Sequence, residues 1–312
     1  MKFTSKKQRD FELANKTHSE LKAMAKESLE NLSRGTRYTN GLQAPPFTVP
    51  NNIKLLSTSY KVEKSLKNSG VRTGILYLAP ADSAGITRGG HTLNICPWAT
   101  DGCKKGCLID SGHMRMSPAR NARLWRTALY AHAPELLKAL LIREIDKLRS
   151  TATTGEKVAV RLDGTSDLGL AELWNFPSLF PDVQFYDYTK SQARIIAYDR
   201  KRTPNMHYTF SASEAPDSQS GARYALDRGL SVAQIVPAKF EPTGEDLTGL
   251  VEHVTGGNNS NMWDKYGFPL IHIEDGDNTD ARFLDKPSTI VYLKAKGGSK
   301  VERNLGGMVY NV

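Results

Sequence analysis

Short apolar runs recur along the chain from residue 71 onward, and polar or helix-compatible segments separate them. Each run has the length and composition of a buried β-strand. In the first run, residues 75–79 form the apolar centre. We therefore expect seven strands, at residues 71–80, 157–162, 183–188, 206–210, 230–236, 270–273 and 289–293.

Helix-compatible segments lie between these runs, at residues 117–150, 168–179, 191–202 and 218–228. The first of them contains Pro134, which divides it into two helices. Strands that alternate with helices form a parallel sheet. The expected fold class is therefore α/β, a complete or partial (β/α) barrel. Residues 237–268 show little periodicity and are expected to form an inserted lid.

The N-terminal part of the chain has a different pattern. Apolar positions at helical spacing in a Lys/Glu-rich background predict one amphipathic helix or two short ones at residues 8–32, and a connector rich in Gly and Pro follows at 33–53. We expect residues 1–70 to be a basic helical extension and linker. Residues 71–312 then form the barrel-like domain.

The composition is that of a folded globular protein, with 312 residues, 39% hydrophobic and 24% charged, and a mean hydropathy of −0.45. No apolar stretch reaches the length of a membrane helix, and the polar N-terminus does not resemble a signal peptide, so we expect a cytosolic protein that does not contact a membrane. The net charge is +9, and residues 1–70 hold 13 basic against 6 acidic side chains. This asymmetry favours a nucleotide or nucleic acid as partner, with a solvated basic helix as the alternative.

The three cysteines of the chain, Cys96, Cys103 and Cys107, all lie in the loop after the first expected strand. An odd and clustered set argues against a disulfide framework and favours a metal site in a reducing compartment. Thiolates select zinc or iron–sulfur clusters. A zinc site would take His91 or His113 as its fourth ligand, whereas a [4Fe–4S] cluster would leave one iron open; three free cysteines are the remaining alternative.

A three-cysteine loop directly after the first strand of a β/α barrel resembles that of the radical S-adenosylmethionine enzymes. The resemblance covers the loop from Cys96 to Cys107 and the strand before it. It implies that the cysteines hold a [4Fe–4S] cluster and that S-adenosylmethionine is a possible cofactor, which the cluster cleaves reductively.

A second resemblance covers residues 70–312 and rests on specific motifs. They are ILYLAP at 75–80, C-P-x-A-x3-C-x3-C-L from Cys96 to Leu108, ARNARLWRT at 119–127, VRLDGTSD at 160–167, FYDYTK at 185–190 and DGDNTDARFLD at 275–285. Together they are similar to a family of uncharacterised proteins encoded by tailed bacteriophages. This implies phage origin and a host-cytoplasmic setting.

Polar residues follow the apolar part of nearly every expected strand. The carboxyl ends of parallel strands meet at one edge of a sheet, where catalytic groups of such folds lie. Carboxylates there can act as base, nucleophile or hydrogen-bond acceptor, and a lysine can bind an anion. The catalytic candidates are Asp163, Asp167, Asp187, Lys190, Asp275 and Asp277.

Several other features bear on the chemistry. Arg161 could bind phosphate or carboxylate, and Arg120, Arg123 and Arg126 recur every three residues and could form a basic strip beside the cysteine loop. No G-x-S-x-G, P-loop or G-x-G-x-x-G motif occurs, which argues against serine hydrolases, P-loop ATPases and dinucleotide oxidoreductases.

Three hypotheses follow from the sequence. The first is a phage iron–sulfur enzyme, resembling radical S-adenosylmethionine enzymes, that acts on a nucleotide or nucleic-acid base. The second is a base-exchanging or hydrolytic barrel enzyme that uses aspartates, with zinc as a structural element. The third is a non-enzymatic, zinc-stabilised protein that binds nucleic acid through residues 1–70.

Overall fold

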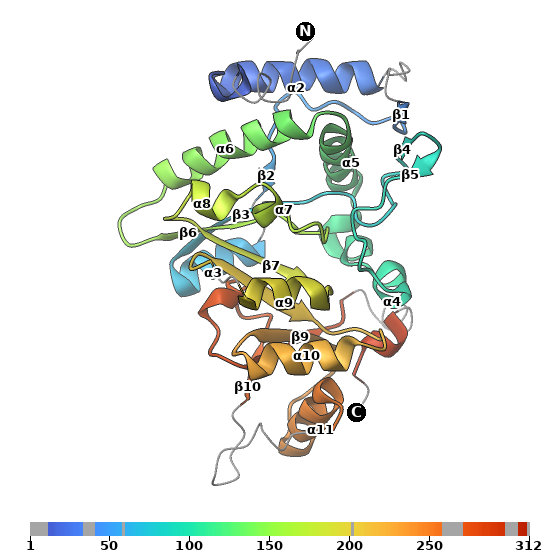
Figure 1. The fold of residues 1–312 in the computed structure, drawn as a ribbon, viewed down its shortest axis with the longest axis vertical. Coiled ribbons are helices and arrows are strands. Elements are labelled where there is room, and N and C mark those ends of the chain that lie inside the picture. Colours follow the sequence, from blue (N-terminus) through green and yellow to red (C-terminus); the bar gives the residue numbers. More distant parts are fainter. Residues whose placement is uncertain are drawn as a thin grey trace.

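One large sheet organises the molecule (Figure 1). The computed structural model describes residues 12–33, 41–57, 60–200, 203–257, 271–296 and 305–310. In spatial order the strands are β10 (His272–Asp275), β11 (Thr289–Lys294), β9 (Ser231–Val236), β8 (Met206–Ser211), β7 (Gln184–Thr189), β6 (Lys157–Arg161), β3 (Val71–Leu76) and β2 (Leu56–Ser57). All of these strands run parallel except β2, which pairs antiparallel with β3. The α/β prediction is confirmed, and each of the seven expected runs contains a strand.

The sheet is open in the part of the chain that the structure describes. Its edges are β2 and β10, and no pairing joins them. A complete barrel, one of the two expected forms, is therefore not observed. Five strands, β3, β6, β7, β8 and β9, follow each other in sequence order, as in a partial (β/α) barrel, but β11 lies between β9 and β10.

The helices pack mainly on one face of the sheet. They are α2 (His18–Ser33), α3 (Tyr60–Ser69), α4 (Asp101–Lys105), α5 (Ser117–His132), α6 (Pro134–Ser150), α7 (Leu170–Leu173), α8 (Phe176–Leu179), α9 (Gln192–Arg200), α10 (Ser218–Asp227) and α11 (Gly244–Thr255). Pro134 divides α5 from α6 as expected. The segment expected as one helix at 168–179 is two short ones, because Asn175 adopts a left-handed φ of 58° between them. Helix α11 occupies part of the segment expected to be a lid.

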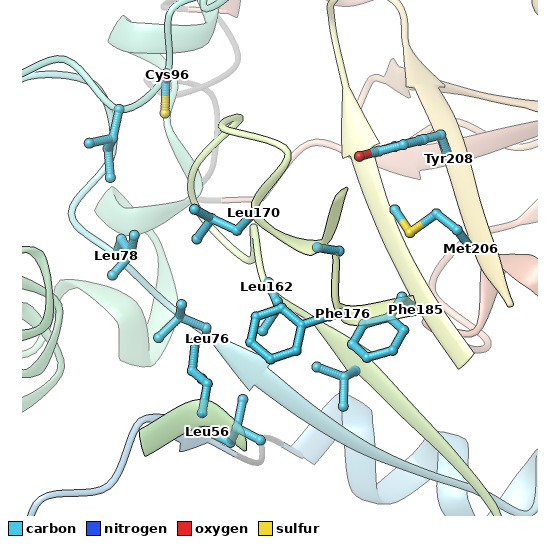
Figure 2. Close-up of a cluster of buried hydrophobic side chains, with 14 of the residues drawn as sticks. Leu56, Leu76, Leu78, Cys96, Leu162, Leu170, Phe176, Phe185, Met206 and Tyr208 are labelled. Carbon is cyan, nitrogen blue, oxygen red and sulfur yellow. The ribbon is translucent and has the colours of Figure 1, made fainter. Parts of the chain in front are cut away.

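The main hydrophobic core lies between the sheet and these helices (Figure 2). Alternate strand residues such as Leu76, Phe185 and Tyr208 point into it and meet Leu170 and Phe176 from α7 and α8. Burial of this apolar surface is the dominant stabilising term of such a fold.

The N-terminal region contributes to the same core. Helix α2 buries Leu21, Ala25, Leu29 and Leu32 and packs on α5 and α6. The buried carboxylate of Glu144, on α6, accepts hydrogen bonds from the backbone N–H groups of Leu55 and Leu56. Residues 8–11 of the expected helix lie outside the described residues. The described part of the extension is thus packed against the sheet domain.

Candidate functional site

The cysteine loop runs along the carboxyl edge of the parallel strands. The Asp167 N–H, in the loop after β6, donates to the Ile95 carbonyl at 3.1 Å. The Gly102 N–H donates to Glu214 Oε1, in the loop after β8, at 2.7 Å. The loop between β3 and α5 is therefore fixed to the ends of two strands that lie further along the sheet.

Cys96 is buried at this edge. Its Sγ accepts a hydrogen bond from the Ala81 N–H at 3.1 Å and lies 3.6 Å from the Thr165 carbonyl oxygen, which follows β6. Burial raises the pKa of the Cys96 thiol to about 12, and Cys107, Cys103 and Asp167 contribute in the same direction. Cys96 is therefore protonated at neutral pH when no metal is bound.

Cys103 and Cys107 lie on and just after the short helix α4. Burial raises the pKa of the Cys107 thiol; Cys103 also raises it, whereas the Arg123 guanidinium lowers it. The three thiols thus lie within electrostatic reach of one another. Because the buried thiols are protonated, the arrangement does not suit a free thiolate nucleophile, and a metal is the usual agent that displaces such protons.

Helix α4 is held tightly from two sides. Thr100 caps its first turn and donates from Oγ1 to Glu214 Oε2 at 2.9 Å. On the other side, Leu305 packs so closely that a Cβ on Gly102 or on Gly106 would lie 2.6 Å or less from its nearest atom. The position of Cys103 therefore depends on contacts from both the end of β8 and the C-terminal segment.

No three His, Cys, Asp or Glu side chains in the described ranges are close enough together to hold a metal ion as they stand. His91 is exposed on β5 (His91–Thr92), which belongs to a small separate sheet with β1 (Leu42–Gln43) and β4 (Thr87–Arg88). His113 is also exposed, and its Nδ1 lies 3.4 Å from Met116 Sδ. Three thiols are therefore gathered without being preset at ligating distance, and binding a metal would bring their sulfur atoms closer together.

Asp163 lies directly after β6 and is engaged on both carboxylate oxygens. It accepts hydrogen bonds from Ser166 Oγ at 2.6 Å and from the N–H groups of Leu168, Gly169 and Leu170 at 2.8–3.1 Å. These bonds shape the turn that leads into α7. Its contacts are those of a residue that holds the strand end in place.

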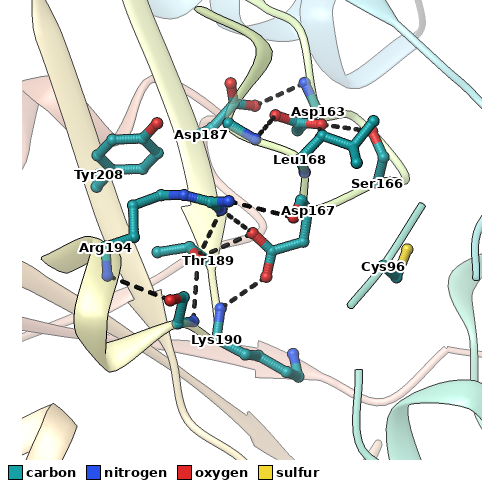
Figure 3. A network of polar contacts seen from close by, with 12 residues as sticks. Cys96, Asp163, Ser166, Asp167, Leu168, Asp187, Thr189, Lys190, Arg194 and Tyr208 are labelled. Carbon is teal, nitrogen blue, oxygen red and sulfur yellow. Dashed lines mark hydrogen bonds and ion pairs between the residues drawn. The ribbon is translucent and has the colours of Figure 1, made fainter. Parts of the chain in front are cut away.

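Asp167 lies between Arg194 and Cys96 (Figure 3). Its carboxylate forms an ion pair with Arg194, accepts from Thr189 Oγ1 at 2.8 Å and accepts from the Lys190 N–H at 3.0 Å. Burial raises its pKa, and the Arg194 charge opposes this. Asp167 thereby joins the ends of β6 and β7 beside the cysteine loop.

Asp187 is buried within β7. Its Oδ1 accepts from the Asp163 N–H at 2.9 Å and lies 3.7 Å from Arg161 Nε, while its Oδ2 has no hydrogen-bond partner among the described residues. Burial and the nearby Asp163 raise the pKa of Asp187 well above its ordinary value. The structure therefore brings Asp163, Asp167 and Asp187 together, as expected.

Lys190 follows β7 and is half-buried. Its Nζ donates to Ser211 Oγ at 2.9 Å, at the end of β8. Asp275 and Asp277 lie elsewhere: they belong to the end of edge strand β10, and β11, β9 and β8 stand between that strand and β7. Asp277 forms an ion pair with Lys296. Three strands of the sheet therefore separate these two aspartates from the candidates on β6 and β7.

The expected basic strip is divided between two environments. Arg123 is buried beside the cysteine loop, where it interacts with Cys107 and Asp110. Arg126 is also buried, but it donates to the Lys54 carbonyl and to Ser57 Oγ and so ties α5 to the N-terminal region. Arg120 is exposed.

On the face of the sheet opposite the helices, sequence reasoning identified Arg161 and Lys190 but missed the contact between Tyr186 and Asp280. Tyr186 Oη donates to Asp280 Oδ2 at 3.0 Å, and Arg161 Nη1 lies 3.6 Å from the same oxygen. The short helix η3 (Arg282–Leu284) lies against this face and buries Arg282, which pairs with Asp285 at 3.5 Å. The polar residues within the motif FYDYTK, at 185–190, were the sequence feature that could have indicated a polar second face of the sheet.

The fold and the site define a class of protein: a mainly parallel, open α/β sheet with three cysteines in its first β-to-α loop, at the carboxyl edge. The chain belongs to the gene product 88 family of bacteriophage proteins, whose sequence profile matches residues 49–307. The match spans the cysteine loop and the whole large sheet. Neither the curated proteins nor the solved structures give a significant match. No described helix is long and apolar enough to cross a bilayer.

Proposed function

We propose that this phage protein is an iron–sulfur enzyme that acts on a nucleotide or a nucleic-acid base in the host cytoplasm. Cys96, Cys103 and Cys107 would hold a [4Fe–4S] cluster, to which S-adenosylmethionine could bind as a cofactor. The observation that carries the proposal is the gathering of three thiols from one loop beside the carboxyl ends of β6 and β8.

The donor set suits such a cluster in its chemistry. All three donors are thiols, which is the ligand type that iron–sulfur clusters use. The buried Arg123 beside Cys107 supplies a positive charge where a thiolate-bound cluster concentrates negative charge. When bound, a cluster with one open iron supplies one-electron chemistry to a molecule held there.

The chain's own residues would bind and orient the substrate at the same edge. Asp167 is within electrostatic reach of Cys96 and fixes the start of the loop after β7 through the Lys190 N–H. Arg194 and Thr189 hold the Asp167 carboxylate in one orientation. Asp167 is therefore suited to positioning, because its oxygens are already occupied.

The two alternatives receive less support. A zinc site needs a fourth ligand, and both candidate histidines are exposed, with His91 in the separate small sheet. An aspartate nucleophile needs a free ionised carboxylate, but Asp163 is fully hydrogen-bonded, and burial raises the pKa of Asp187 well above its ordinary value. The hydrophobic face of α2 is buried against α5 and α6, so this helix is not a free nucleic-acid-binding arm.

Reductive cleavage of S-adenosylmethionine tests the proposal. Protein reconstituted anaerobically with iron and sulfide, then given dithionite and S-adenosylmethionine, is expected to release 5′-deoxyadenosine. The Cys103→Ser variant is the matched control, since it removes one thiol and nearly preserves size. Absence of product from protein that carries a cluster would refute this cofactor assignment.

A further inference from the structure

The face of the sheet opposite the helices carries polar side chains near the carboxyl edge. Phe185, Tyr208 and Phe210 point into the core under the helices, so alternate positions of β7 and β8 face the other way. Parallel strands covered on both faces are ordinarily apolar throughout. We define the polar patch as the five residues Arg161, Tyr188, Lys190, Thr209 and Ser211.

Lys190 is the fixed cation of the polar patch. Its Nζ donates to Ser211 Oγ at 2.9 Å, and no carboxylate in the described ranges forms an ion pair with it. Its backbone N–H is held by Asp167, which is itself held by Arg194. An ammonium group with a hydroxyl beside it and a fixed backbone is preorganised for an anion.

Thr209 supplies a buried hydroxyl one row below Lys190 and Ser211. It pairs in register with Tyr188, is 1% exposed, and its Oγ1 has no hydrogen-bond partner within the described part of the chain. A buried hydroxyl without a partner destabilises the folded protein. A ligand that accepts or donates at this position would satisfy the group.

Arg161 belongs to the polar patch but adds no net charge to it. Its guanidinium lies 4.6 Å from the centroid of the Tyr188 ring. Asp187 and Asp280 lie 3.7 and 3.6 Å from its nitrogens, so its charge is already balanced. The uncompensated positive charge of the polar patch is therefore that of Lys190.

We infer that the polar patch binds the phosphate group of a nucleotide, with Lys190 as the principal cation and the Ser211 and Thr209 hydroxyls as hydrogen-bond partners. A lysine ammonium is a compact point charge that suits phosphate, whereas carboxylates are most often held by the arginine fork. The Lys190 backbone is bonded to Asp167, which neighbours Cys96, so the phosphate would lie beside the cysteine loop. This inference rests on the proposed function for the nucleotide class of the substrate.

Calorimetric titration of the full-length protein with nucleoside 5′-monophosphates and with the matching nucleosides tests the inference. Lys190→Met is expected to weaken nucleotide binding roughly 10- to 100-fold and to leave nucleoside binding unchanged. Lys147→Met, an exposed lysine on α6, is the matched control and should bind as the unaltered protein does. Inorganic phosphate should compete with the nucleotide, and acetate should not.

The Thr209→Val variant tests whether the Thr209 hydroxyl serves ligand binding or the stability of the fold. It keeps the shape and removes the unpartnered hydroxyl, so it is expected to raise the thermal unfolding midpoint while weakening nucleotide binding. Equal affinity of the Lys190→Met variant and the unaltered protein, or equal competition by acetate, would overturn the inference. Metal analysis of the same samples distinguishes the two proposals. Nucleotide binding that depends on Lys190 in iron-free protein would support the phosphate site whatever the outcome of the iron–sulfur test.

Discussion

Glu214 accepts a hydrogen bond from the Gly102 backbone N–H at 2.7 Å and so joins the end of β8 to the helix that carries Cys103. The same carboxylate accepts from Thr100 Oγ1 at the start of that helix. A carboxylate at a helix N-terminus satisfies backbone donors that have no partner within the helix. Glu214, which follows the fourth strand of the series β3, β6, β7 and β8, thus fixes a cysteine contributed by the loop after the first strand.

Replacing Glu214 with Ala is expected to loosen α4 and to expose Cys103. Alkylation of Cys103 in chelator-treated protein should then become several-fold faster, as measured by mass spectrometry, because both hydrogen bonds to the helix start are lost. Glu241→Ala, an exposed glutamate in the loop before α11, provides the control. An unchanged alkylation rate would show that Glu214 does not position Cys103.

Gly102→Ala is expected to destabilise the protein by about 1 to 3 kcal/mol. Glycine to alanine ordinarily stabilises a helix, but a Cβ here would lie 2.6 Å from the Leu305 carbonyl oxygen and 2.8 Å from Glu214 Oε1. Gly244→Ala in α11 is the matched control, since nothing lies within 4 Å of its added Cβ. Urea denaturation measures both, and equal effects of the two changes would contradict the packing described for α4.

The Asp163→Asn variant tests whether Asp163 has a structural role in the turn after β6. The amide cannot accept all four hydrogen bonds that the carboxylate accepts, so the free energy of unfolding should fall by about 2 to 4 kcal/mol. Asp227→Asn, an exposed aspartate at the end of α10, should change it by less than about 0.5 kcal/mol. Full stability of the Asp163→Asn variant would mean that these hydrogen bonds do not hold the turn.

Asp285 predicts a pH dependence of stability. Burial raises its pKa to about 7 in the folded chain, with Arg282 opposing and Glu274 adding to the rise, whereas the unfolded value is about 3.9. Between these values the folded state binds more protons than the unfolded state, so this group lowers the free energy of unfolding as pH rises.

The Asp285→Asn variant cannot titrate at this position. The free energy of unfolding of the unaltered protein, minus that of the variant, should fall by roughly 1 kcal/mol per pH unit between pH 5 and 7 and then level off. Urea denaturation at pH 5, 6, 7 and 8 measures this difference. A difference that stays constant with pH would show that Asp285 does not titrate in this range.

The large sheet was predictable because its strands are short apolar runs with clear separators. A run such as LSVAQIV, at 230–236, predicts a buried strand from its own composition, without knowledge of the segments that pack against it. Helix α11 was missed, although Thr243 and Asp246 form a capping box at its start. The two-residue strands of the small sheet are too short to show any periodicity.

Sequence could predict only those parts of the candidate site whose residues lie close together in the chain or at the ends of neighbouring strands. The cysteines are close together in the chain, so their gathering could be expected, and Asp163, Asp167 and Lys190 share adjacent strand ends. Glu214 could not be assigned, because its partners lie more than 100 residues away. The order of the last strands, with β11 between β9 and β10, likewise depends on contacts that local patterns do not encode.

Metal and sulfide content after strictly anaerobic purification is the decisive measurement for a cluster held by the three cysteines. We expect about four irons and four sulfides per chain with broad visible absorption, and their loss in a variant that replaces Cys96, Cys103 and Cys107 with serine. One zinc per chain in a colourless protein, or no bound metal, would contradict it.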